Sequence, residues 1–187
     1  MEFGNTSDVI DSLCNIAMAS AAVYAAWNAK DWLSPKINEK KFRFADELIG
    51  LFCKIQEDAF YLHSEAKKTI NIDPDVQGDA DKFRQLWNKI QEKNYTYRKN
   101  TINLRTAMER MDLWGLKAKN KDEFINIIDA HLTLSYTIED ALSIGASETR
   151  FRLQNSFEYD KQISDKYKIV RGSHNKIMKH YNELFVN

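Results

Sequence analysis

The segment from residue 73 to residue 81, Asp-Pro-Asp-Val-Gln-Gly-Asp-Ala-Asp, has the spacing of carboxylates most like a metal site in this sequence. Laid on the calcium loop of EF-hand proteins, its aspartates and glycine fall at ligand and turn positions. The fifth position is Gln77, however, and the twelfth, where a bidentate glutamate closes a calcium site, is Arg84. An arginine there places a cation where calcium needs two oxygens. We therefore interpret the segment as a solvated turn in which Asp79 or Asp81 caps the next helix.

The four histidines are scattered along the chain. His180 and Glu183 are one helical turn apart, but a di-iron bundle needs paired Glu-x-x-His motifs and further carboxylates on facing helices. His131 and His174 lie on apolar stripes, so we expect buried imidazoles with hydrogen-bond partners rather than metal ligands. His63 lies on a polar face without a second ligand nearby in the sequence. We therefore predict no metal and no cofactor.

The sequence also shows no residue in the context of a catalytic nucleophile. Cys14 and Cys53 have no CxxC spacing and no context that would activate a thiol, and their small number suits a reducing compartment. No serine lies in a nucleophile elbow, and no glycine-rich phosphate loop is present. The Arg-x4–6-His signature of helical-bundle ribonucleases is not matched, because Arg171 and His174 are too close together and Arg105 has no histidine in range. The sequence therefore predicts no enzyme activity.

One stretch combines cations with aromatic rings, which can neutralise phosphates and stack on bases. Its members are Lys93, Tyr95, Tyr97, Arg98, Lys99 and Arg105. Glu92 and Glu109 dilute this charge, and the whole chain balances 27 Lys and Arg against 27 Asp and Glu. We therefore expect a solvated helix face, and nucleic acid is a disfavoured partner.

The elements that position these residues are predicted to be helices. The 187 residues include only 6 Gly and 2 Pro, too few to form the turns of a β-sandwich. Apolar periodicity predicts an all-α fold of five long helices, over about residues 8–33, 35–69, 80–114, 121–144 and 148–184. The first boundary rests on Ser34-Pro35, read as a cap followed by proline at the first helical position. Short turns predict antiparallel hairpins in a bundle.

The third predicted helix has the most regular pattern, an alternating 4-3 spacing typical of coiled-coil-like packing within the chain or with a partner. This packing seam consists of Phe83, Trp87, Ile90, Asn94, Tyr97, Thr101, Leu104 and Met108. Two of its positions are polar, Asn94 and Thr101. They either fix the register of the helices or are tolerated defects.

The first predicted helix has two interpretations. Residues 13–27 contain thirteen apolar residues of fifteen, with aromatic residues at one end and a basic stretch after them. A ridge of small residues, which lets helices approach closely in lipid, consists of Ala17, Ala21, Ala25 and Ala29. We therefore predict a membrane anchor over residues 9–33, in a domain of residues 1–34, followed by a helical domain of residues 35–187. The alternative is an alanine-rich helix buried in a soluble bundle.

The string AAVYAAWNAKDWL and the basic stretch after it resemble the amino ends of small, uncharacterised bacterial accessory proteins. The resemblance covers about 25 residues of this chain. It implies one N-terminal anchor and a cytoplasmic helical region, and it carries no catalytic motif.

These patterns predict a membrane-anchored helical interaction protein, a scaffold, adaptor or sensor. It would lie at the cytoplasmic side of a bacterial inner membrane with its N-terminus outside. We expect it to act by self-association through the alanine ridge and by binding an unknown protein through the packing seam. The alternative is a soluble, cytoplasmic helical-bundle effector of the toxin or defence type, with nucleic-acid-binding or nuclease activity.

Overall fold

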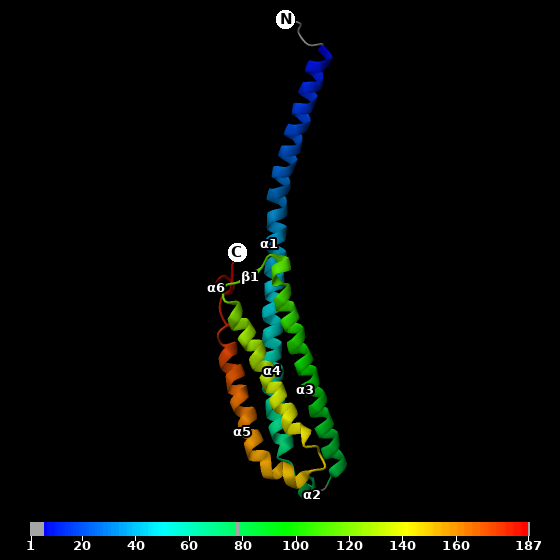
Figure 1. The fold of residues 1–187 in the computed structure, drawn as a ribbon, viewed down its shortest axis with the longest axis vertical. Coiled ribbons are helices and arrows are strands. Elements are labelled where there is room, and N and C mark those ends of the chain that lie inside the picture. The colour runs from blue at the N-terminus through cyan, green and yellow to red at the C-terminus, as the bar shows by residue number, and fades with distance from the viewer. Residues whose placement is uncertain (1–5, 78, 187) are drawn as a thin grey trace. The chain divides into compact units, whose positions relative to one another are not determined.

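The computed structural model describes the backbone of residues 6–77 and 79–186, and the side chains of residues 18–24, 36–76, 79–180 and 182–186. The prediction of an all-α fold is confirmed. The helices are α1 Thr6–Ile70, α2 Pro74–Gln77, α3 Ala80–Glu109, η1 Arg110–Trp114, α4 Lys121–Ser143, α5 Thr149–His174 and α6 Tyr181–Leu184 (Figure 1). Two short strands, β1 Lys117–Ala118 and β2 Phe185–Val186, form a small antiparallel sheet. The chain divides into two compact units, one up to Phe44 and one from Ala45 onward.

The second unit is an antiparallel four-helix bundle. It consists of α1 from Ala45 onward together with α3, α4 and α5. Glu65 of α1 forms an ion pair with Lys93 of α3, and Lys67 of α1 forms one with Asp160 of α5. The helix α4 packs along both α3 and α5. Each helix therefore contacts the next one in the chain, and α5 returns to α1 and closes the bundle.

Apolar side chains spaced three and four residues apart on these helices form the core. Those with less than 2 % exposure include Leu48, Phe52, Ile70, Ile90, Leu104, Phe124, Ile127 and Ile128. The rings of Phe52 and Phe124 lie 5.4 Å apart across the bundle, a favourable distance for an aromatic pair. The helix α1 therefore packs against the first turn of α4.

The eight residues of the packing seam are the buried residues of α3. Their 4-3 spacing places them on one face of the helix, and this face lies inside the bundle. They pack against this chain's own helices, so the surface on which we expected a partner protein is occupied within the chain.

The helix break expected at Ser34-Pro35 is absent, because α1 is one helix from Thr6 to Ile70. Proline lacks one backbone donor and disturbs the preceding turn, at a cost of about 3 kcal/mol. The residues after it include good helix formers such as Lys36 and Glu39, and extending a helix is far easier than starting a new one. Ser34-Pro35 therefore lies inside α1, and the two compact units meet between Phe44 and Ala45.

The last predicted helix is also corrected, because α5 ends at His174 rather than near residue 184. Gly172 and Ser173 have poor helix propensity, and the Ser173 hydroxyl donates to the backbone oxygen of Val170. Beyond this point the chain continues to the end of the bundle where α4 begins, and the Lys119 amide donates to the Leu184 carbonyl at 2.8 Å (Figure 1). This C-terminal segment buries Ile177, Leu184 and Phe185, and the Phe185 ring stacks on Phe124.

Within the described residues, no helix combines the length and the apolar character that crossing a bilayer requires. The predicted anchor covers residues 9–33, and the side chains of 9–17 and 25–33 lie outside the described set. The same is true of Ala17, Ala25 and Ala29 in the alanine ridge, and of Cys14. The fourth member of the ridge, Ala21, is described and is exposed.

Candidate functional site

The aspartates of the 73–81 segment stabilise turns. Asp79 is the N-cap of α3, and its side chain accepts a hydrogen bond from the Lys82 amide at 2.9 Å. Asp73 accepts one from the Asp75 amide at 3.0 Å. Among the described residues, no three His, Cys, Asp or Glu side chains gather as they would around a metal ion. Of the two capping residues that the sequence suggested, the structure selects Asp79.

The stretch of cations and aromatic rings on α3 is largely neutralised. Arg98 donates to both carboxylate oxygens of Glu139 on α4, one of them at 2.9 Å, and this pair holds the pKa of Glu139 below its usual range. Arg105 lies 3.6 Å from Asp129, and Tyr97 is buried. A phosphate backbone would have to compete with these carboxylates for the same cations. The arrangement therefore weakens the case for an effector that binds nucleic acid.

A row of buried polar groups joins α3 to α4. The Asn94 amide donates to the Ser135 carbonyl, and the Ser135 hydroxyl donates to Asn94 Oδ1, both at 3.0 Å. Thr101 instead donates to the backbone oxygen of Tyr97 within its own helix. Of the two polar seam residues, Asn94 therefore sets the register of α3 against α4, because a shift would leave buried groups unpaired. Thr101 makes no such bond across the helices.

Next in this row, the Tyr97 hydroxyl lies 2.6 Å from Nδ1 of His131, which is fully buried. Burial, assisted by nearby His174, lowers the pKa of His131 from 6.5 to about 3, so its imidazole is neutral at physiological pH. Burial also raises the pKa of Tyr97 well above 10, with smaller contributions from Asp58 and Tyr167. The pair is therefore a neutral phenol bonded to a neutral imidazole inside the bundle.

The second buried histidine, His174, differs from His131 in its hydrogen bonding. Its Nδ1 and the Nε2 of His131 are both buried and have no hydrogen-bond partner among the described atoms. Burial lowers the pKa of His174 as well. We expected both imidazoles to be core histidines with a partner, and a partner is present at His131 only. His63, expected on a polar face, stacks on the Tyr167 ring with centroids 3.7 Å apart.

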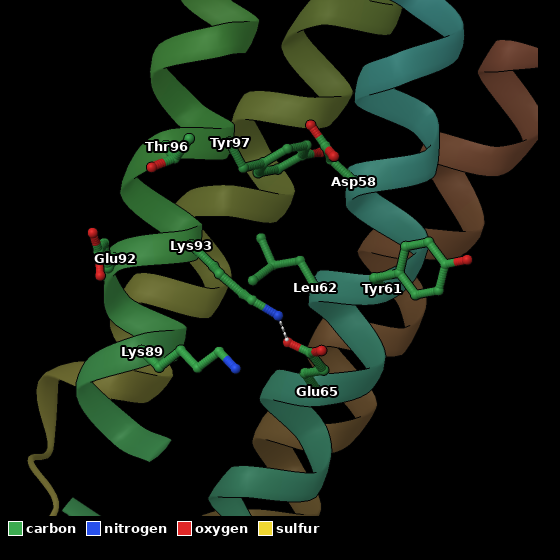
Figure 2. A pocket seen from close by; sticks show the side chains of 9 residues that line it. All are labelled: Asp58, Tyr61, Leu62, Glu65, Lys89, Glu92, Lys93, Thr96 and Tyr97. Carbon is green, nitrogen blue, oxygen red and sulfur yellow. Dashed lines mark hydrogen bonds and ion pairs between the residues drawn. The ribbon is translucent and has the colours of Figure 1, made fainter. Parts of the chain in front are cut away.

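A pocket of about 480 Å³ lies between α1 and α3, beside the Tyr97–His131 pair (Figure 2). Asp58 and Tyr97 line one end, Lys89 and the Lys93–Glu65 ion pair line the other, and Leu62 lies between them. Its volume is in the range of small-molecule sites. Sequence reasoning missed this pocket, because its residues come from two helices and share no motif.

Sequence reasoning also missed Arg152, a fully buried arginine on α5. Its Nη1 donates to the backbone oxygens of Ile70 and Ile72, at 2.5 and 2.6 Å, where α1 ends. Its guanidinium lies over the Phe83 and Trp87 rings, 4.7 and 5.6 Å from their centroids. One signal was available: Arg152 lies eleven residues before the buried Ile163, about three helical turns, and so on the same stripe of α5.

In the first unit, the described side chains of α1 are exposed from Met18 to Tyr24. Met18, Val23 and Tyr24 have 63 %, 65 % and 71 % of their surface exposed. Large apolar groups exposed within one short stretch of helix are typical of surfaces that contact another molecule.

The geometry defines a class of protein, an all-α protein with an antiparallel four-helix bundle and a buried polar row. Comparison of the chain with protein-family models, with curated proteins and with solved structures finds no match. Any function must therefore be inferred from the features described above.

Proposed function

We propose that this chain is a helical interaction protein of the scaffold or adaptor type, in which the N-terminal part of α1 attaches the bundle to a membrane. The observation that carries the proposal is the exposure of Met18, Val23 and Tyr24 on one stretch of helix. Burying such side chains in an apolar environment is favourable by roughly 25 cal/mol per Å². The sequence of residues 13–27, which includes these three, is apolar at thirteen of its fifteen positions.

The bundle supports the same proposal by what its polar groups do. Arg98 and Asn94 bond across helices, and Asp79 caps a helix. These groups hold the bundle together, so the proposed attachment falls to the part of α1 that precedes Ala45. Self-association through the alanine ridge is part of the proposal, and exposed Ala21 is its described member.

Membrane attachment is tested by fractionating cells that express the full chain and washing their membranes at high pH. We expect the wild-type protein to stay with the membranes and the Met18→Lys/Val23→Lys variant to be released. A lysine near the centre of a span costs about 2.5–3.5 kcal/mol. The Gln91→Lys/Gln154→Lys variant adds the same charge at exposed positions of the bundle and should stay bound. Release of the wild type would contradict attachment.

Self-association is tested by substituting the exposed ridge residue, Ala21→Leu. A bulky side chain would separate two helix backbones that pack through small residues, so we expect a several-fold lower yield of crosslinked dimer. Ser64→Leu, at a half-buried position of α1 in the bundle unit, is the matched control. An unchanged dimer yield for Ala21→Leu would count against the ridge.

A further inference from the structure

The pocket between α1 and α3 is electrically bipolar. Its charged residues include a close ion pair, in which Lys93 Nζ lies 2.5 Å from Glu65 Oε2, so these two charges largely cancel. Figure 2 shows Glu92 turned away from the other side chains. Among the described side chains that line the pocket, Asp58 and Lys89 then remain as charges without an ion-pair partner, one at each end.

The negative end suits an ammonium group. The carboxylate of half-buried Asp58 lies beside the phenol of Tyr97, which is only 2 % exposed. The hydroxyl of Tyr97 is held by His131 at 2.6 Å, so its position is fixed before any ligand arrives. A carboxylate, a phenol oxygen and the ring of Tyr97 are groups that a cation prefers, whereas Figure 2 shows the Tyr61 ring extending from α1 away from this end.

The positive end suits a carboxylate. Figure 2 shows the ammonium of Lys89 turned toward the side of the pocket where Glu65 and Lys93 pair. Asp58 and Glu65 are seven residues apart on α1, about 10 Å along the helix axis. Leu62 lies between the two ends and provides apolar surface for a hydrocarbon spacer.

We propose that this pocket is a binding site for a small zwitterion, an amino acid whose ammonium and carboxylate are separated by several methylene groups. The ammonium binds at Asp58 and Tyr97, and the carboxylate binds at Lys89. A ligand with two like charges leaves one end of the pocket facing a charge of its own sign, so the amino acid is preferred over a diamine or a diacid.

The test compares three six-carbon probes that differ only in charge: 6-aminohexanoate, 1,6-diaminohexane and adipate. Each is titrated into the full-length protein, followed by calorimetry and by the thermal unfolding midpoint. We expect 6-aminohexanoate to bind and to raise the thermal unfolding midpoint. The diamine and the diacid should bind with at least about tenfold lower affinity. No binding of 6-aminohexanoate up to about 10 mM would overturn the proposal, because so weak an affinity has no specific contact behind it. Equal binding of the diamine or the diacid would overturn the assignment of the two ends.

Two variants locate the ligand. Asp58→Asn and Lys89→Met each remove one charged end at a position that is not fully buried, and each should weaken binding about tenfold or more. Glu57→Gln, the exposed neighbour of Asp58 outside the pocket, should bind like the wild type. The unfolding midpoint without ligand shows that each variant is folded. Unchanged affinity in both Asp58→Asn and Lys89→Met would place the ligand elsewhere and overturn the proposal.

Discussion

Arg152→Ala is expected to lower the free energy of unfolding by about 3–5 kcal/mol, because two backbone carbonyl oxygens lose their donor and the truncated side chain leaves a cavity. The guanidinium supplies donors for two carbonyl oxygens at the end of α1, and no side chain replaces them in the variant. The rings of Phe83 and Trp87 also lose the cation that covers them. Urea denaturation of the variant and the wild type at pH 7 measures the difference.

Two further variants separate the causes of this loss. Arg152→Lys keeps the positive charge but lacks the planar fork, so we expect it to recover only part of the stability. Arg150→Ala removes an exposed arginine two residues away and should change stability by about 0.5 kcal/mol or less. If Arg152→Ala were as mild as Arg150→Ala, the buried guanidinium would have no part in holding α5 against the end of α1.

Acidification is expected to destabilise the bundle from about pH 6.5 downward. The pKa of His131 is about 3 in the folded protein, against 6.5 for a free histidine, so between these values only the unfolded chain binds the proton. Stability therefore falls with falling pH, by up to about 1.4 kcal/mol per pH unit for this one group. At pH 5 the loss from His131 is about 2 kcal/mol. His174 adds to it in the same direction, because burial lowers its pKa as well.

This pH dependence is measured by urea denaturation at pH 7, 6 and 5. In His131→Gln an amide can still bond to Tyr97 but cannot titrate, so the fall between pH 7 and pH 5 should shrink by about 2 kcal/mol. His180→Gln removes an exposed histidine and should follow the wild-type curve. Parallel curves for His131→Gln and the wild type would show that this imidazole is not the group that titrates.

The local periodicity of the sequence is sufficient to predict the bundle. The seam of α3 from Phe83 to Met108 was predicted residue by residue, because burial on one face leaves the same 4-3 spacing wherever the face packs. Whether such a face packs within the chain or on a partner depends on where the other helices lie. Spacing within one helix carries no information on that point.

Helix ends were predicted less well, since they depend on small differences in free energy. The helix α4 begins at Lys121 as its periodicity predicts, with Asn120 as an N-cap whose side chain makes no capping hydrogen bond. Ser34-Pro35 resembles a helix start yet lies within α1. The helix α5 ends at His174, and beyond it Ile177, Leu184 and Phe185 are buried outside any continuation of that helix. Where a helix ends therefore depends on tertiary contacts with other parts of the chain as well as on the local sequence.

The pocket and the buried row were beyond prediction for a related reason. Asp58, Tyr97 and His131 come from three helices, and only the rotation of each helix about its axis brings them together. One sequence shows which residues share a face, as it does for Arg152 on α5, but not which faces meet.

The C-terminal segment that covers the end of the bundle where α4 begins has a consequence for biosynthesis. Ile177 to Phe185 leave the ribosome after all four bundle helices have been made, yet they complete the core at the end where Phe124 lies. The nascent protein therefore passes through a stage in which its helices are available but this end is still uncovered, with apolar rings facing water. Chaperones that bind exposed apolar surface would bind the protein at this stage. Pairing of β2 with β1 then completes the fold.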